Sequence, residues 1–285
     1  MDPDVFLELA NTVSKMKMFP YFEMAHAIIS CIYIRDDLAA GSHQFSRKHP
    51  FSCWVSSMIN IFAGGLLSNF LLGEPIIDVF KNHNQVMLAS AVWYMIFYSP
   101  FDIIYKICKF APIKIVISAM KEVIRCKKIH DGVVSASKIY PNSYLIMTII
   151  GTVKGNGSGF MKIIERLMRG IWTPNAFELL TPTFPTKAAI GASIIFIVDK
   201  KTDWISVPHS IVYLGVVSFF LYFKISSLLI NLHDPFIPFE NLFCQLFMGG
   251  VWDAFAHIIS KSAKKKEENN PKVEIPRRED KTRKD

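Results

Sequence analysis

The sequence contains no cysteine pairs, few charges and no recognisable catalytic arrangement of side chains. Its five cysteines are scattered without a C-x-x-C pair, so their spacing predicts neither a zinc site nor a disulfide framework. The eight histidines are scattered too, without a Ser/His/Asp set or the H-x-x-E type of spacing that membrane metalloproteases need. Charged residues make up only 20% of the chain, and hydrophobic residues make up 51%. We therefore expect neither an enzyme nor a metal-binding protein.

Hydrophobic residues lie in long blocks rather than in alternating patterns, which is typical of membrane proteins. A helix needs about 20 apolar residues to cross about 30 Å of hydrocarbon. Three of the blocks contain no charge, and four others contain or adjoin charged residues. The sequence therefore predicts an all-α membrane protein with seven transmembrane helices. The predicted spans are 18–34, 51–72, 86–101, 110–126, 142–170, 181–198 and 204–223.

Glycine spacing relates the two halves of the chain. The pair Gly64–Gly65 lies in the second block, and Gly157, 93 residues after Gly64, lies in the fifth. The same shift moves the first block onto the fourth and the third block onto the sixth. Because each set has three crossings, the second set must run opposite to the first in the membrane, which predicts two inverted three-helix repeats and a seventh helix. The predicted segments are a luminal N-terminus (1–17), the first repeat (18–107), the second repeat (110–199), the seventh transmembrane helix (204–230), a juxtamembrane segment (231–259) and a disordered basic tail (260–285).

The C-terminal tail decides the predicted orientation. From Ser260 to Asp285 the chain has ten Lys or Arg against six Asp or Glu, which supplies +4 of the net charge of +8. Basic residues after the last span favour the cytosolic side of the membrane. Seven crossings then place the N-terminus in the lumen.

The stretch GNGSGF in the fifth block raises the question of a phosphate-binding loop. It lacks the Lys-Ser/Thr pair of a P-loop and has no strand-to-helix context, so nucleotide binding is excluded and no nucleic-acid partner is expected. Clustered glycines break a helix inside a membrane, and the freed backbone groups must face protein or water rather than lipid. We therefore expect the second helix of each repeat to be broken at glycines that line a polar passage. The predicted break and pore residues are Gly64, Gly65, Lys121, Gly155, Asn156, Gly157, Ser158 and Gly159.

A basic stripe occupies the fourth block. Lys114, Lys121, Arg125 and Lys128 are spaced by seven, four and three residues, which places them on one helix face. Three interpretations remain open: side chains that reach the interface from a helix end, a voltage sensor, or a site for an anionic ligand such as a phosphoinositide headgroup. Glu122 lies about 100° round the helix from Lys121, so it is free to pair elsewhere.

A second basic face follows the glycines. It comprises Lys162, Arg166 and Arg169, and it either borders the same passage or anchors the cytosolic end of the helix. Three further polar residues near predicted helix ends serve either in packing or at a pore mouth. They are Glu23, His26 and Asp102.

Several stretches together resemble the trimeric intracellular cation (TRIC) channel family, most closely its invertebrate members of type B. The resemblance covers nearly the whole chain before the tail, including the seven-span layout. The matching stretches are MFPYFEMAH (18–26), FAGGLLSN (62–69), YSPFD (98–102), KEVIRCKKI (121–129) and GNGSGFM (155–161).

The resemblance implies a homotrimer in the endoplasmic or sarcoplasmic reticulum membrane, with one pore in each protomer. Such channels pass potassium as a counter-ion during calcium release and uptake, and are functionally coupled to calcium-release channels. The resemblance also implies a structural lipid, phosphatidylinositol 4,5-bisphosphate, whose headgroup is held by Lys121 and Arg125 with the backbone around Gly157 nearby. From the residues alone, a secondary transporter with inverted repeats is the alternative, because broken helices serve both kinds of protein.

Overall fold

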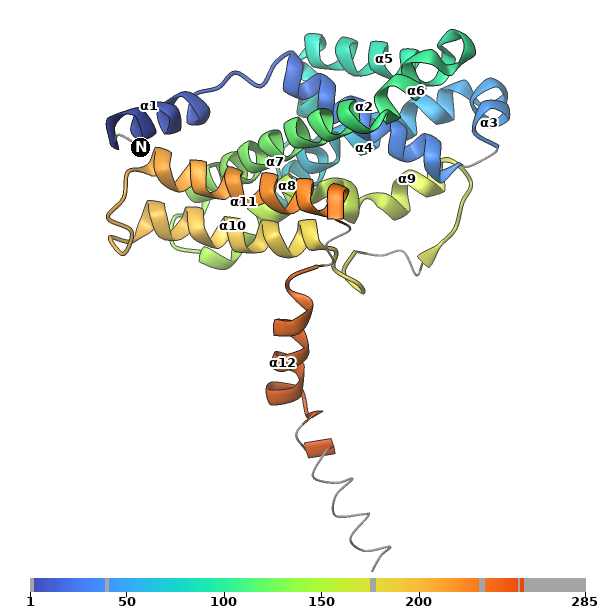
Figure 1. Cartoon of the computed structure of the whole chain (residues 1–285). Helices are drawn as coiled ribbons and strands as arrows, with labels where there is room; N and C mark the ends of the chain where they lie inside the picture. Colours follow the sequence, from blue (N-terminus) through green and yellow to red (C-terminus); the bar gives the residue numbers. More distant parts are fainter. Residues whose placement is uncertain (1–2, 39–40, 175–177, 231–233, 251, 254–285) are drawn as a thin grey trace, which may run out of the picture. The chain divides into compact units, whose positions relative to one another are not determined.

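The computed structural model of the chain describes residues 3–38, 41–174, 178–230, 234–250 and 252–253. The chain forms two compact units, residues 1–233 and 234–285, which we describe separately. The described residues are helical with connecting turns (Figure 1). The helices of the first unit are α1 (Pro3–Ser14), α2 (Tyr21–Asp37), α3 (Ser42–Lys48), α4 (Pro50–Leu72), η2 (Ile76–Lys81), α5 (His83–Tyr98), η3 (Pro100–Asp102), α6 (Ile103–Lys109), α7 (Ala111–Ile139), α8 (Tyr144–Phe160), α9 (Lys162–Met168), α10 (Phe184–Lys201) and α11 (His209–Ile230). The second unit contains α12 (Ile237–Phe247).

Proline and glycine mark the ends of α4. Pro50 occupies its first turn, where the missing N–H of proline costs no helical hydrogen bond. Gly73 ends it in the left-handed conformation, with φ of 73°, and Glu74 N–H donates to the carbonyl of Asn69 at 2.9 Å. This is the glycine C-cap expected of a helix that stops sharply.

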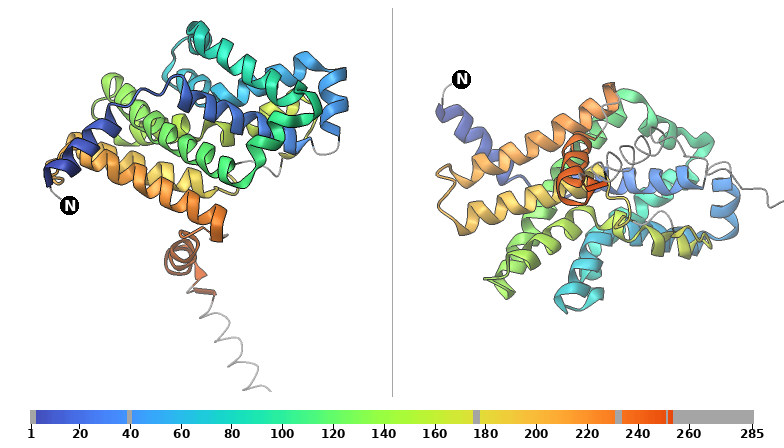
Figure 2. Two further views of the ribbon diagram at one scale, coloured as in Figure 1. Left: turned by 45° about the horizontal axis from the view of Figure 1, so that its top comes forward. Right: turned by 90° about the horizontal axis from the view of Figure 1, so that it is seen from below.

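The chain bends by 92° between α5 and α6. Pro100 follows α5 and removes a backbone donor there, and Phe101 and Asp102 both have positive φ, at 52° and 58°. The third predicted crossing therefore ends at Tyr98, and α6 leaves in a new direction (Figure 2).

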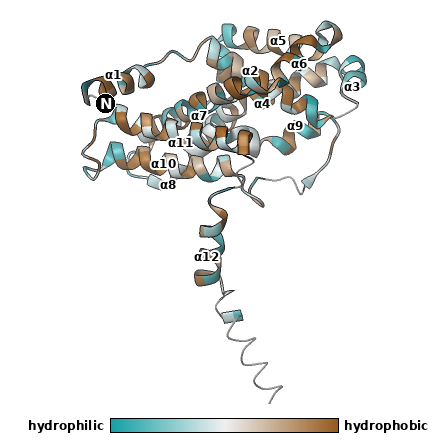
Figure 3. Ribbon diagram, viewed as in Figure 1, coloured by the Kyte–Doolittle hydropathy of each residue, from teal (hydrophilic) through white to brown (hydrophobic). Residues whose placement is uncertain are grey.

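Helix α7 lies at the centre of the first unit and packs against α2, α8, α10 and α11. Helix α8 packs in addition against α4 and α10. Helices α10 and α11 run side by side in each view (Figures 1 and 2). Hydrophobic residues predominate along most of these helices (Figure 3). This arrangement brings the fourth and fifth predicted spans, which carry the basic stripe and the glycines, into direct contact.

Each predicted span coincides with a helix or a helix pair, but few qualify as membrane spans by length and composition. Among the described residues, α4 and α11 do so, and the bent pair of α5 with η3 and α6 is a third. Helices α2 and α8 have 17 residues each, and α7 carries the basic stripe. The number of seven crossings stays a prediction.

The predicted glycine break in the first repeat is wrong. Helix α4 runs as one helix from Pro50 to Leu72 and passes through Gly64 and Gly65 without interruption. Two adjacent glycines weaken a helix by only about 1 kcal/mol each, so packing on both sides suffices to keep the backbone helical.

Candidate functional site

The glycines of the two predicted repeats meet where α4 crosses α8. A Cβ atom added to Gly157 would lie 2.4 Å from the Cα of Gly64, and one added to Gly64 would lie 2.3 Å from the carbonyl oxygen of Lys154. No side chain fits between two backbones this close, so both positions require glycine. The 93-residue spacing relates these two positions in the sequence, and the structure places them in contact.

Further glycines let α8 approach its other neighbours. A Cβ on Gly155 would lie 2.3 Å from the side chain of Ile129 on α7, and one on Gly132 of α7 would lie 2.9 Å from the Cα of Gly151. Glycine therefore serves close packing along α8 as well as conformational freedom.

Helix α8 is kinked at Asn156, whose φ of −128° and ψ of 32° fall outside the helical range. Its Nδ2 donates to Thr186 Oγ1 of α10 at 2.7 Å, and Thr186 Oγ1 in turn donates to the buried carboxylate of Glu178 at 2.5 Å. A Cβ on Gly159 would lie 2.9 Å from Asn156 Nδ2 and also 2.9 Å from Glu178 Oε2. The side chain of Asn156 at the kink thus bonds to protein rather than facing lipid, where an unpaired polar group is costly.

The basic stripe of α7 divides into paired and unpaired side chains. Arg125, 9% exposed, donates from Nη1 to Glu122 Oε2 at 2.5 Å, so Glu122 pairs within its own helix rather than with Lys121. Lys121 and Lys128 are half-buried, and neither forms a salt bridge within the described residues. Two lysines without a salt bridge among the described residues therefore line this part of α7.

The register of α7 against α8 places the stripe near the kink. Gly155 lies against Ile129, and Gly151 lies against Gly132 and Val133, so the two helices run antiparallel. Arg125 is one turn before Ile129, which brings it toward the kinked end of α8. Ser158, in that end, is half-buried. The predicted lipid-binding residues Lys121, Arg125 and Gly157 thus belong to two helices that pack against each other.

The chain has relatives among known proteins. The TRIC channel family model matches residues 39–231. The chain belongs to the TRIC channel family. Its members are channels in membranes and not enzymes, which confirms the expectation from the missing catalytic residues.

Individual TRIC channels resemble the chain over most of its length. It is 45% identical to trimeric intracellular cation channel type 1B.1 of Caenorhabditis elegans, over 98% of this chain and 97% of the relative. A solved structure of a C. elegans trimeric intracellular cation channel without Ca²⁺ superposes with a TM-score of 0.77 at 47% identity, covering 82% of this chain and all of that one. A structure described as the basis for activity of TRIC counter-ion channels in calcium release has a TM-score of 0.74 at 32% identity, over 79% and 99%. The predicted similarity to invertebrate type B members is confirmed.

The second basic face of this TRIC family member forms an ion-pair network between α2 and α9. Arg166 Nε donates to Asp37 at 3.1 Å, Arg169 Nη2 donates to Asp37 at 2.7 Å, and Arg169 Nε donates to Glu165 at 2.6 Å. Arg169 and Glu165 are fully buried. These arginines therefore join two helices, unlike the unpaired lysines of α7.

The same network governs the ionisation of Asp37, which lies beyond the predicted span 18–34. Burial opposes ionisation, but the hydrogen bonds and charges of Arg166 and Arg169 outweigh it and hold the pKa of the Asp37 carboxyl below its usual value. Asp37 is therefore a carboxylate at neutral pH. The sequence does not predict the role of Asp37, because Asp37 is 129 residues from Arg166 and nothing local marks the pairing.

The three polar residues for which the sequence left both packing and a pore mouth open all form side-chain contacts with neighbouring elements. Asp102 pairs with buried Arg35 at 2.8 Å and with His43 at 2.8 Å, across the bend between α5 and α6. His26 Nε2–H donates to the carbonyl of Ile61 at 2.9 Å, which ties α2 to α4. Glu23 accepts from Gln85 at 3.4 Å.

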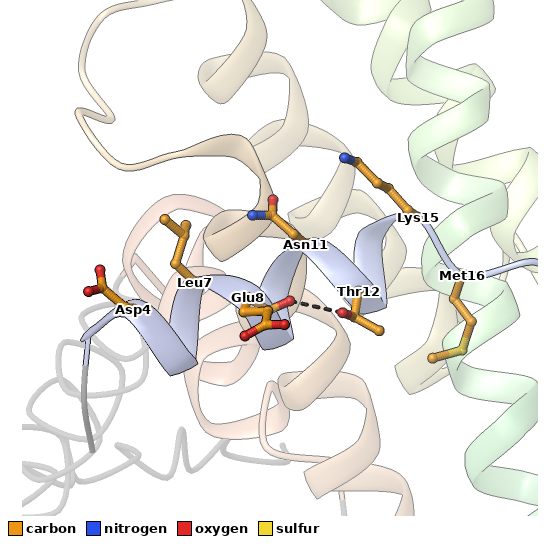
Figure 4. A pocket seen from close by; sticks show the side chains of 7 residues that line it. All are labelled: Asp4, Leu7, Glu8, Asn11, Thr12, Lys15 and Met16. Carbon is orange, nitrogen blue, oxygen red and sulfur yellow. Dashed lines mark hydrogen bonds between the residues drawn. The ribbon is translucent and has the colours of Figure 1, made fainter.

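A pocket at the bend between α5 and α6 is lined by Asp102 and His43, whereas a pocket beside α1 holds none of the predicted site residues. The pocket beside α1 is lined by seven residues of one helix and the turn after it, with Thr12 donating to the carbonyl of Glu8 (Figure 4). Within the described part of the chain, no cluster of three or more His, Cys, Asp or Glu side chains is arranged to hold a metal ion.

Proposed function

We propose that this chain forms a homotrimeric monovalent-cation channel of the endoplasmic or sarcoplasmic reticulum, with one pore per protomer that conducts potassium as a counter-ion for calcium movement and couples it to calcium-release channels. Family membership supports the channel, and the relatives described as trimeric and as counter-ion channels support the assembly and the role.

The observation that carries the proposal is the position of the unpaired cations. Lys121 and Lys128 lie on α7, whose next turns pack on α8 just before its kink. A bare row of cations would repel potassium, so an anion must balance them in a conducting pore. We propose that the headgroup of phosphatidylinositol 4,5-bisphosphate does so, held by Lys121 and Arg125 beside Gly157.

The two inverted three-helix repeats are part of the proposed channel architecture. If the two halves are related by a two-fold axis in the membrane plane, equivalent residues near that axis must lie close together. Gly64 and Gly157 are equivalent in the 93-residue shift, and their backbones are in contact. This contact supports two inverted repeats crossing at α4 and α8. We propose α11 as the seventh helix, and the basic residues of the tail favour a cytosolic C-terminus, which seven crossings combine with a luminal N-terminus.

Lipid content tests the site. We expect Lys121→Met to lower the phosphoinositide that co-purifies with the full-length protein by at least about tenfold, since a charged hydrogen bond contributes about 1.5–3 kcal/mol. Lys121→Met leaves the Arg125–Glu122 pair intact, whereas the double change Lys121→Ala and Arg125→Ala removes both predicted ligands. Mass spectrometry of extracted lipid measures the result.

The matched control is Lys127→Ala, also on α7, whose side chain pairs with Asp131 at 3.2 Å. It should leave lipid content at the wild-type level. Wild-type lipid content in both Lys121 variants would contradict the assignment of the headgroup to this site.

A further inference from the structure

Helix α12, in the second unit, has an amphipathic face that the channel function does not use. Five apolar residues recur at spacings of three and four, which places them on one side of the helix. The opposite side carries Glu240, Asn241, Cys244 and Gln245. The apolar side consists of Phe239, Leu242, Phe243, Leu246 and Phe247.

The apolar side is uncovered. The five side chains are between 51% exposed, for Phe243, and 71% exposed, for Phe239 and Phe247. Within the described residues no side chain of α12 is buried. Large aromatic and aliphatic residues in one contiguous exposed row mark an interaction surface.

The chain itself brings α12 to a membrane surface. Helix α11 is long and apolar enough to cross a membrane, and it ends at Ile230, seven residues before Ile237. Seven residues span at most about 25 Å, so α12 begins close to the surface at which α11 ends. Exposed Trp252 follows α12, and tryptophan favours that interface.

The charge of the sequence after α12 also favours a membrane surface as the partner of this helix. The sequence after α12 contains Lys261 and the run Lys264, Lys265 and Lys266. Basic residues close to a membrane are attracted to anionic lipids by about 1 kcal/mol each. A second copy of α12 is a poorer partner, because 11 residues are too few for a coiled coil, which needs at least three heptads.

We propose that α12 is an interfacial helix that lies in the plane of the membrane surface where α11 ends, with Phe239, Leu242, Phe243, Leu246 and Phe247 among the lipid chains. This inference depends on α11 as a membrane span but not on the lipid site of α7. Its partner is the bilayer surface.

Spin labels on the full-length protein test the inference in vesicles of phosphatidylcholine and phosphatidylserine. Cys244 is exposed on the polar side of α12, and the four other cysteines are buried. One sample carries the label at Cys244, a second carries Leu242→Cys with Cys244→Ser, and Cys244→Ser alone is the blank. Positions 242 and 244 are about 200° apart on a helix.

We expect the label at position 242 to collide mainly with oxygen, which concentrates in lipid, and the label at position 244 to collide mainly with a nickel chelate in water. Equal access of the chelate to both positions would overturn the proposal. Low access of both reagents at position 242 would also overturn it, because that result indicates a protein partner.

A pair of charge variants gives an independent reading from the label at position 242. Leu246→Glu places a carboxylate on the apolar side and should expose the label to the chelate, because burying a charge in lipid is costly. Asn241→Glu adds the same charge on the polar side and should leave the label in lipid. Both variants lie outside the first unit, so size-exclusion elution should match wild type. An unchanged label environment in Leu246→Glu would contradict the interfacial placement.

Discussion

At the residue scale, the close crossing of α4 and α8 depends on two glycines, which have only a hydrogen atom where other residues have a side chain. Gly64 and Gly157 are close enough that any Cβ would strike backbone rather than a flexible side chain. Backbone cannot yield without moving a helix, so these positions differ from Gly65 and Gly155, whose nearest neighbours are side chains.

We therefore expect Gly157→Ala to lower the free energy of unfolding by about 1–3 kcal/mol, the usual effect of overpacking. The matched control is Gly191→Ala in α10, where an added Cβ meets nothing within 4 Å and helix propensity alone favours alanine by up to about 1 kcal/mol. The melting temperature of each variant is measured on the detergent-solubilised protein by heating samples and monitoring the folded fraction by size-exclusion chromatography. Equal melting temperatures for the two variants would show that the crossing is looser than described.

At the scale of elements, α2 and α9 are joined by buried charge. Asp37 accepts from two arginines, and Arg169 is held on its other side by Glu165. Removing Asp37 leaves half-buried Arg166 without its carboxylate partner, whereas Arg169 keeps Glu165, and an unsatisfied group of this kind costs about 1–3 kcal/mol.

Asp37→Asn should accordingly destabilise the protein by about 1–3 kcal/mol at neutral pH, where the low pKa of Asp37 keeps it charged. That contribution is present above the ordinary carboxyl pKa and is lost as pH falls through the lowered one. The comparison is Asp78→Asn, whose salt bridge with Lys81 is exposed and which should change stability by less than about 0.5 kcal/mol. A melting temperature for Asp37→Asn equal to that of Asp78→Asn would refute the role of the network.

Helices α4, α8 and α9 show which structural features the sequence predicts and which it does not. The three glycines around Asn156 predicted a break in the fifth block, and the kink lies there, because a cluster of flexible residues acts on its own helix. The pair at Gly64 predicted a break that is absent, because packing against α8 keeps α4 helical through it. The partner of Arg166 was not predictable, since ion pairs between distant helices leave no periodic trace in one sequence.

At the scale of the whole molecule, family membership and the arrangement of α4, α7 and α8 point to one function. The channel identity came from stretches spread over nearly the whole chain, and the family match covers residues 39–231. The proposed pore location rests on three features of α4, α7 and α8: the crossing at Gly64 and Gly157, the kink at Asn156, and the half-buried Lys121 and Lys128. A carrier with inverted repeats would share these features but would move ions one cycle at a time.

Single-channel recording of the purified full-length protein in a planar bilayer tests the central claim most directly. In symmetrical potassium chloride, with phosphatidylinositol 4,5-bisphosphate in the bilayer, we expect unitary current steps that Lys121→Met reduces and Lys127→Ala preserves. Potassium flux that is slow and saturable, without unitary steps in the wild-type protein, would contradict the account.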